Sequence, residues 1–409
     1  MRKIIVFDDD PTGIQTVQGC LLVTDWSEEN LRKAFEDKED FFYILTNTRA
    51  MTRDDAAATT ESAMEAVLKE YSHFKKVHGM EDDRLVFISR SDSCLRGHFP
   101  LETDVMKDVL RKHGIEIWAK TPFCPAFIEA GRVTKEGIHY MIADGRKIPV
   151  SETEFAKDNV FGYHHSELHE YIKEKGGNAD DYDIVNANCY QQLDNYAQRL
   201  LTDTEHFDGA VVIRSSSSLP KAMAHVPDQA LLEKDILENG TDGSCGVIIV
   251  GSHVKKTTGQ LEELLKCEGT EGVEVDVEEI LHTPESLLKE VTERLSALNA
   301  RHITPVIYTS RKEVRLDDAD KRQKMGQTIS DFLVSIVQHL PFTPSYLIAK
   351  GGITSHDILC KGLKVKTARV LGQILSGVPC IMTDRFPYII FPGNVGDKDA
   401  LKEVFIKLR

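Results

Sequence analysis

Short apolar runs of strand length recur along the chain, and segments with a helical period separate many of them. The clearest helical segment spans residues 53–77, where apolar side chains up to Val77 fall on one face and Thr52 with Asp55 predicts an N-terminal cap. Such alternation predicts the α/β class, with mainly parallel sheets flanked by helices. The runs expected to form strands are 4–7, 20–23, 41–45, 85–88, 115–118, 184–185, 210–213, 247–250, 306–308, 346–348, 380–382 and 388–391.

A chain of 409 residues is too long to fold around one hydrophobic core of ordinary size, so we expect two domains. Serines at 215–218 and an Asn/Gly/Ser cluster at 239–244 have the composition of a linker and bracket the expected boundary. We therefore predict an N-terminal domain of residues 1–235 and a C-terminal domain of residues 236–409. The segment 123–163 has few apolar runs, and so long a stretch without clear elements is usually functional.

Charge and composition exclude several classes of function. The net charge of -15 argues against binding a nucleic-acid backbone, which needs a basic surface. No apolar stretch reaches the roughly 20 residues that span a bilayer, and the first residues lack the pattern of a signal peptide. The eight cysteines are scattered without metal-ligand spacing, which favours reduced thiols and a cytoplasmic location.

An acidic turn follows the first apolar run. Asp8, Asp9 and Asp10 precede a proline/glycine break, so a buried strand would deliver carboxylates to the open edge of a sheet, where ligands bind. Asp9 or Asp10 could be the general base that activates a hydroxyl in phosphoryl transfer. Alternatively, Asp8, Asp10 and Thr12 fit the Asp-x-Asp-x-Thr signature of haloacid-dehalogenase-type phosphatases, with Asp8 as nucleophile. A solvated turn that caps the next segment is the non-functional alternative.

A second polar cluster follows the run at 85–88. Two arginines near a strand end suit a small anionic substrate, because a guanidinium fork binds a carboxylate through two hydrogen bonds. Serine and aspartate side chains beside them can hydrogen-bond hydroxyl groups, although an ordinary surface loop with a salt bridge would look similar. The candidate substrate-binding residues are Arg90, Asp92, Ser93, Arg96, Gly97 and His98.

Three glycine turns follow apolar runs in the C-terminal half. Glycines let a backbone approach phosphates closely, and the turn before the expected helix at 355–359 would present free N–H groups. None is a Walker A motif, and each alone could be a tight turn or a helix cap. Together they predict a phosphate-binding site. The candidate residues are Ser252, Gly351, Gly352, Ile353, Thr354, Gly393, Asn394 and Gly396.

Taken together, these motifs resemble the four-carbon acid sugar kinase family, and the resemblance runs nearly from end to end. The acidic turn looks like its Asp-Asp-x-Thr-Gly opening, and the second cluster is similar to its Asp-Ser-Thr-Leu-Arg-Gly signature, here with Cys94 in place of threonine. Further blocks that resemble the family lie at 125–127, 131–134, 137–140, 153–158, 251–252, 351–354, 377–379 and 393–396.

The resemblance implies an N-terminal sugar-acid domain, a C-terminal ATP domain and an active site in the cleft between them. It implies ATP-dependent phosphorylation of the C4 hydroxyl of a tetronate such as erythronate, threonate or a 3-oxo-tetronate. Asp10 by preference, or Asp9, would accept the hydroxyl proton, Arg90 and Arg96 would hold the carboxylate, and Mg²⁺ would bridge two phosphates of ATP without a metal site of the protein's own. A homodimer is the expected assembly. A catalytically silent regulator that binds sugar acids or nucleotides is the non-enzymatic alternative.

Overall fold

The computed structural model describes residues 3–81, 84–143, 145–237, 244–310 and 319–409. The chain divides into two compact units, Met1–Asp228 and Gln229–Arg409, here called unit 1 and unit 2. The serines at 215–218 are not a linker, because all four are buried and Ser215 ends a strand of unit 1. The second expected linker cluster, 239–244, lies outside the described residues except for Ser244.

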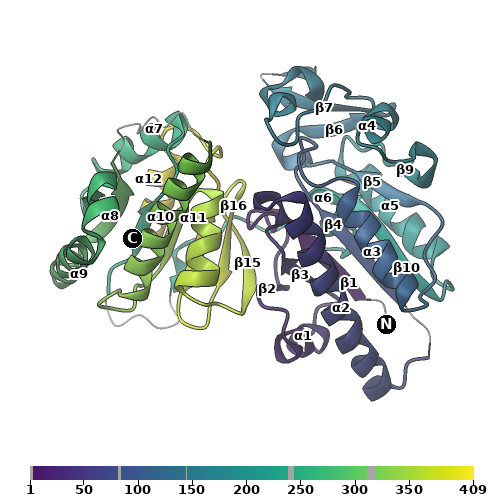
Figure 1. Ribbon diagram of the computed structural model, residues 1–409, viewed down its shortest axis with the longest axis horizontal. Coiled ribbons are helices and arrows are strands. Elements are labelled where there is room, and N and C mark those ends of the chain that lie inside the picture. Colours follow the sequence, from purple (N-terminus) through teal and green to yellow (C-terminus); the bar gives the residue numbers. More distant parts are fainter. Residues whose placement is uncertain (1–2, 82–83, 144, 238–243, 311–318) are drawn as a thin grey trace. The chain divides into compact units, whose positions relative to one another are not determined.

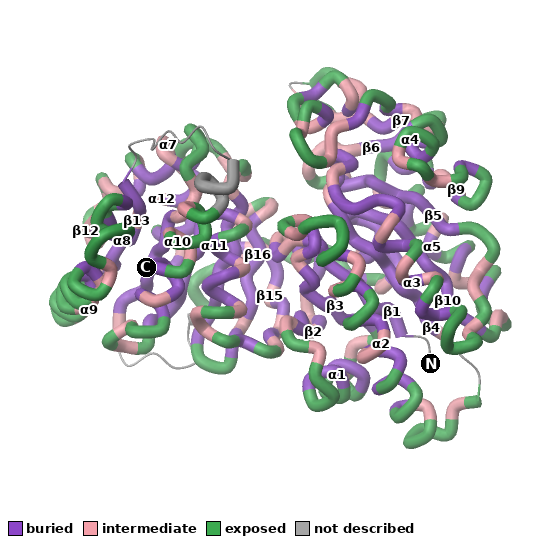
Figure 2. Tube along the Cα trace, viewed as in Figure 1, coloured by how far each residue is buried: buried purple, intermediate pink, exposed green. Residues whose placement is uncertain are grey.

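Unit 1 contains a parallel sheet in the order β2-β3-β1-β4-β10-β5-β9. Strands β1, β3 and β10 are buried along their whole length, as expected for parallel strands covered on both faces (Figure 2). The strands are β1 (Lys3–Asp8), β2 (Leu21–Val23), β3 (Phe41–Leu45), β4 (Arg84–Arg90), β5 (Thr121–Cys124), β9 (Tyr182–Ile184) and β10 (Gly209–Ser215).

Helices of unit 1 bury apolar faces against this sheet. The long helix α2 (Arg53–His78) begins where predicted, because Thr52 Oγ1 accepts a hydrogen bond from the Asp55 amide at 3.2 Å. It shares one core with side chains of α1 and α3, and Figure 1 shows its ribbon beside those of both helices. Val77, expected on the apolar face, is 62% exposed because it falls in the last turn. The other helices are α1 (Glu28–Phe35), α3 (Leu101–Lys112), α4 (Leu168–Glu174), α5 (Tyr190–Asp203) and α6 (Ser218–Met223).

The segment 123–163, which showed few elements in the sequence, contains a small antiparallel sheet. Its strands are β6 (Arg132–Lys135), β7 (Ile138–Ala143) and β8 (Arg146–Pro149). They were missed because strands this short and half-exposed carry little apolar periodicity. Beside them lies an aromatic core that includes Phe99, Phe123, Tyr163, Tyr171 and Tyr182.

Unit 2 contains a mixed sheet in the order β12-β13-β11-β14-β17-β16-β15. Its pairs are parallel from β12 to β17 and antiparallel from β17 to β15. The strands are β11 (Val247–Val250), β12 (Thr270–Val275), β13 (Thr304–Thr309), β14 (Leu347–Lys350), β15 (Thr367–Leu375), β16 (Val378–Met382) and β17 (Pro387–Phe391). The helices are α7 (Lys255–Leu264), α8 (Val277–His282), α9 (Pro284–Ala300), α10 (Ala319–Gln338), α11 (Gly352–Asp357) and α12 (Ala400–Leu408).

The predicted α/β class with mainly parallel sheets is confirmed. One expected strand is wrong: residues 115–118 form only an isolated bridge, between Ile117 and Ala210, because the chain meets β10 there and turns away. The helix expected at 355–359 instead begins at Gly352 and passes into a π-helix, Ile358–Gly362. In the part of the chain that is described, no helix combines the length and apolar character needed to span a membrane.

Candidate active site

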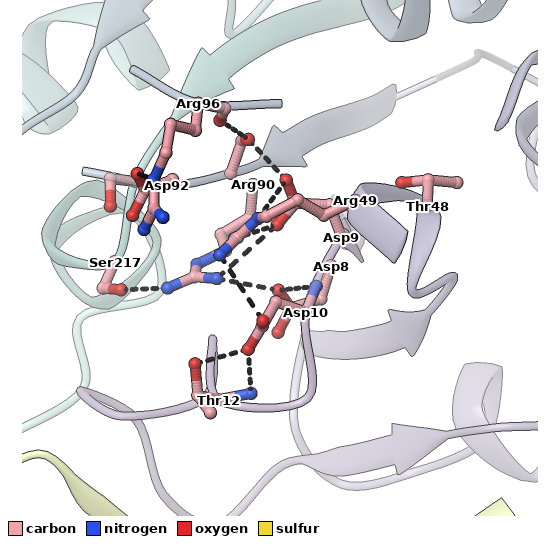
Figure 3. A network of polar contacts seen from close by, with 12 residues as sticks. Asp8, Asp9, Asp10, Thr12, Thr48, Arg49, Arg90, Asp92, Arg96 and Ser217 are labelled. Atoms are coloured by element: carbon pink, nitrogen blue, oxygen red, sulfur yellow. Dashed lines mark hydrogen bonds and ion pairs between the residues drawn. The ribbon is translucent and has the colours of Figure 1, made fainter. Parts of the chain in front are cut away.

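The polar clusters of unit 1 meet at the carboxyl edge of its sheet. Strand register places Asp8 of β1 beside Arg90 of β4, and Arg90 beside Ser215 of β10. Each strand continues into a polar loop at this edge, where ligands of open α/β sheets bind. Figure 3 shows the resulting network of ion pairs. Within it, Arg90 pairs with Asp8, and Arg49 pairs with Asp9 and Asp10.

Asp8 is the most enclosed of the three aspartates. Its side chain is fully buried, Arg90 NH1 lies 3.1 Å from Oδ1, and Oδ2 has no hydrogen-bond partner among the described residues. A Cβ atom on Gly13 would overlap both carboxylate oxygens, so this glycine leaves room for Asp8. Burial raises the pKa of Asp8 to about 7 against the opposing charge of Arg90, and Asp9 and Asp10 add to the rise. The carboxylate therefore presents no exposed surface to a ligand.

Asp9 is also buried, but both of its oxygens are paired. Arg49, which follows β3, donates NH2 to Oδ1 at 2.5 Å and Nε to Oδ2 at 3.1 Å. Ser91 Oγ donates to Oδ2 at 2.5 Å. Because both oxygens are occupied and the side chain is only 2% exposed, Asp9 is positioned to orient Arg49 rather than to receive a proton from a ligand.

Asp10 is the most accessible carboxylate of the turn, with 21% of its side chain exposed. Oδ1 accepts hydrogen bonds from the Thr12 amide at 2.8 Å and from Thr12 Oγ1 at 2.5 Å, and Oδ2 lies 3.4 Å from Arg49 NH1. Burial favours the neutral form, but the Arg49 charge and the Thr12 hydrogen bonds outweigh it and lower the pKa of Asp10 below its ordinary value. Asp10 is therefore an ionised carboxylate with one lightly engaged oxygen.

Arg90 differs from its expected role as a ligand for the substrate carboxylate. Its side chain is 4% exposed, NH1 pairs with Asp8, and NH2 donates to Ser217 Oγ at 2.8 Å. A guanidinium engaged in this way neutralises the aspartate cluster and has little surface left for a ligand. Arg214 is likewise buried and engaged by a carboxylate, because its Nη1 lies 2.5 Å from Glu102 Oε2 beneath the same edge of the sheet.

Arg96 is the arginine of this cluster that remains open. Its side chain is 26% exposed, Nε donates to Asp92 Oδ2 at 2.7 Å, and the guanidinium lies 4.9 Å from the centre of the Phe155 ring. Burial disfavours the charged form of Asp92, but Arg49 and Arg96 lower its pKa to about 2. The pair is preorganised, and although Arg96 Nη1 also lies 3.8 Å from Asp158 Oδ2, the exposed part of the guanidinium retains N–H groups for an anion.

The remaining candidates of this loop are buried. Ser93 and His98 are each 7% exposed, and His98 Nε2 lies 3.1 Å from the carbonyl oxygen of Met51. Gly97 has a φ of 126°, which only glycine adopts readily, and a Cβ there would lie 3.0 Å from Asp9 Oδ2. These residues fix the loop against the acidic turn.

In unit 2, the three glycine turns lie together. Register pairs Val250 with Lys350 and Lys350 with Phe391, so β11, β14 and β17 end side by side and each continues into a glycine turn. A Cβ on Gly351 would lie 3.1 Å from Ser252 Cβ, and one on Gly393 would lie 3.4 Å from Ser252 Oγ. Ser252 therefore lies between the other two turns. Gly351 also has a φ of 118°, which requires glycine.

The other candidates of unit 2 surround this centre. A Cβ on Gly251 would overlap Thr354 Oγ1, so β11 and the start of α11 approach closely. The carbonyl oxygen of Asn394 accepts a hydrogen bond from Lys256 Nζ at 3.3 Å, and Ile353 is 67% exposed. Gly396 has a φ of 81° and packs against α12. Gly352 begins α11.

Lys350 is buried directly beneath the glycine turns. Its side chain is fully enclosed, Nζ donates to the carbonyl oxygens of Pro392 at 2.7 Å and Gly393 at 3.4 Å, and it lies 4.0 Å from the centre of the Phe391 ring. Burial, aided by the positive charge of Lys256, lowers the pKa of Lys350 to about 7. This amine holds the turn at Gly393 in place.

Sequence reasoning gave no role to Arg49, Ser217 or Lys350. Arg49 lies in an unremarkable stretch, and Ser217 was assigned to a linker. Lys350 had a signal, because a lysine at the end of an apolar strand before two glycines is unusual for a buried position.

Comparisons with known proteins agree with the division of the chain into two units. Residues 4–213 match the model of a sugar-binding N-terminal domain, and residues 247–401 match that of a nucleotide-binding C-terminal domain. None of the curated proteins compared with the chain matches it.

Two solved structures are similar in fold. A Haemophilus influenzae protein of the DUF1537 family has 18% identity and a TM-score of 0.66, covering 99% of this chain and 100% of its own. A Salmonella typhimurium LT2 protein, described as a tRNA synthase, has 16% identity and a TM-score of 0.69, covering 100% and 99%. With both domain models matched in order and most of the chain covered, the protein belongs to the four-carbon acid sugar kinase family.

Proposed function

We propose that this protein is an ATP-dependent kinase that phosphorylates the C4 hydroxyl of a four-carbon sugar acid, such as erythronate, threonate or a 3-oxo-tetronate. The observation that carries the proposal is the state of Asp10: it is the accessible, ionised carboxylate at the carboxyl edge of a sugar-binding unit, beside two buried aspartates. An ionised carboxylate that a ligand can reach is able to accept a hydroxyl proton, and phosphoryl transfer depends mainly on positioning and charge compensation.

In this proposal, each polar residue of the acidic turn and its neighbours in unit 1 has a separate role in the reaction. Asp10 Oδ2 accepts the proton of the attacking hydroxyl, while Thr12 holds Oδ1 and fixes the direction of the carboxylate. Arg49, held by Asp9, supplies positive charge next to the reacting oxygen. Arg96 binds the carboxylate of the sugar acid, and Arg90 balances the charge of Asp8. Positioning and charge compensation of this kind dominate phosphoryl transfer.

Unit 2 supplies the nucleotide site in this proposal. Glycine turns at three adjacent strand ends let the backbone approach phosphate oxygens closely, and the hydroxyls of Ser252 and Thr354 and the backbone of Gly393 suit that contact. The Ser252 and Gly351 amides are already used, because they donate to the carbonyls of Lys350 and Phe391. In this proposal Mg²⁺ would be held by phosphate oxygens of ATP and by water. Mg²⁺ bound there would neutralise developing phosphate charge.

The alternatives are less well supported. A phosphatase with Asp8 as nucleophile would need that carboxylate to touch substrate, whereas it is fully buried behind Gly13. A silent binding protein would gain thermal stability from ligands without forming ADP. We retain a homodimer as the expected assembly, to be measured by light scattering.

The test is ADP release from ATP over a panel of four-carbon sugar acids, with Asp10→Asn beside the wild type. We expect turnover with at least one acid and loss of turnover in the variant, with ATP affinity nearly unchanged. Asp203→Asn, at an exposed helix position, is the matched control and should remain active. Full activity of Asp10→Asn would remove its role as base, and no ADP with any acid would refute the kinase.

A further inference from the structure

In the loop Asp92–Gly97, five of the six carbonyl oxygens each accept a hydrogen bond from a separate donor. The Asp92 carbonyl accepts from the Leu95 amide at 3.1 Å, and the Gly97 carbonyl accepts from the Phe99 amide at 2.9 Å. Ser91 Oγ lies 2.9 Å from the sixth, the Arg96 carbonyl, but donates its proton to Asp9 Oδ2 at the shorter distance of 2.5 Å. The carbonyls of Ser93, Cys94 and Leu95 each accept a hydrogen bond from a side chain outside the loop.

Those three side chains come from the segment around the small sheet. His139 Nε2 donates to the Ser93 carbonyl at 2.7 Å, and Tyr163 and Tyr171 donate their hydroxyls to the next two carbonyls, of Cys94 and Leu95, at 2.8 and 2.7 Å. All three side chains are buried. We call them the carbonyl clamp.

The chemistry of His139 suits this task. Because a carbonyl oxygen can only accept, Nε2 carries the proton, and Nδ1 therefore accepts from Thr134 Oγ1 at 2.9 Å. Burial lowers the pKa of His139 to about 4, so the ring stays neutral and keeps this tautomer at physiological pH.

The amides of the loop show the opposite pattern. Across the described residues, the N–H groups of Ser93, Cys94, Arg96 and Gly97 have no hydrogen-bond acceptor, although Ser93, Cys94 and Gly97 are buried residues. Buried backbone donors are nearly always paired, so these groups call for an acceptor from outside the protein. Leu95 has a φ of 65°, and a left-handed residue within a turn lets neighbouring N–H groups converge on an anion.

We propose that the loop Asp92–Gly97 is a backbone site for the carboxylate of the sugar acid, and that His139, Tyr163 and Tyr171 are positioning residues that hold its amides toward that carboxylate. The inference rests on the proposed function and deepens it: recognition of the acid group passes from Arg90, which is buried, to these amides together with Arg96. The site selects a carboxylate over a neutral alcohol group.

The experiment measures kcat and KM for erythronate and threonate, and for erythritol and threitol, which lack the carboxylate. Tyr163→Phe and Tyr171→Phe each remove one hydroxyl from a carbonyl, and we expect each to raise KM for the acid about tenfold, with KM for ATP unchanged. The preference for acid over polyol should fall by the same factor. A folding defect alone would lower the turnover of acids and of polyols by the same factor.

His139 offers a matched pair. Gln can keep a donor near the Nε2 position, so His139→Gln should retain most of the acid preference, whereas His139→Asn, whose amide is too short, should lose it. Tyr196→Phe, which removes a hydroxyl that contacts Asp183, is the control and should match the wild type.

The outcomes separate the two proposals. If the wild type releases no ADP with any tetronate, the proposed function fails and the carboxylate site fails with it. If the wild type is active but the clamp variants keep its KM and its acid preference, the kinase stands and the clamp is overturned. Equal turnover of acids and polyols by the wild type would also overturn it.

Discussion

Replacing Lys350 with methionine should stabilise unit 2 and weaken its nucleotide site. The amine is fully buried and donates hydrogen bonds to two carbonyl oxygens, and no carboxylate pairs with it among the described residues. Methionine has a similar length and no charge, so Lys350→Met removes the buried ammonium while filling the same space.

The pKa gives the size of the effect. Burial lowers the pKa of Lys350 from 10.5 to about 7, and one pKa unit corresponds to about 1.4 kcal/mol. Below pH 7 both the folded and unfolded states carry the proton, and the folded state bears the full cost. As pH rises toward 10.5 the folded state is neutral, and the cost disappears. It is roughly 5 kcal/mol at pH 6 and about 2 kcal/mol at pH 9.

The assay is thermal and denaturant unfolding of wild type and Lys350→Met at pH 6 and pH 9. The stability advantage of the variant should be larger at pH 6, by about 3 kcal/mol. Lys366→Met, at an exposed position, is the control and should show no such difference. Loss of the contacts to Pro392 and Gly393 should weaken binding of a fluorescent ATP analogue about tenfold. An advantage that does not change with pH would refute the reasoning.

Two other substitutions probe the acidic turn. Asp8→Asn removes a carboxyl group whose pKa is raised to about 7 in the folded state, so the wild-type protein loses folding stability as pH rises from about 4 to 7. In thermal melts, the wild type should therefore become less stable relative to Asp8→Asn between pH 5 and pH 8. Melting temperatures that change in parallel with pH would contradict this. Gly13→Ala forces a methyl group onto the Asp8 carboxylate and should cost about 1–3 kcal/mol and most of the activity. The control is Gly259→Ala, in open space within α7, which should leave activity unchanged and not lower stability, because alanine favours a helix. A stable, active Gly13→Ala would show that Asp8 can move.

Local patterns identified the elements whose signal lies within a short stretch of chain. The buried strands at 41–45 and 247–250 were predicted with their observed bounds, because parallel strands covered on both faces read as unbroken apolar runs. The start of α2 was predicted because the Thr52 cap is a contact between residues three apart. The small sheet had no such signal.

That carboxylates and glycine turns follow strands can be read from the chain alone, because strand length, apolar runs and chain breaks are local properties. Which of these residues are open and which are enclosed depends on how the chain folds. Asp8, Asp9 and Asp10 are identical in the chain, yet their exposure and partners differ because Arg49, Arg90 and Gly13 approach them differently. Register between strands far apart in the sequence sets such contacts, and it depends on the packing of the whole sheet.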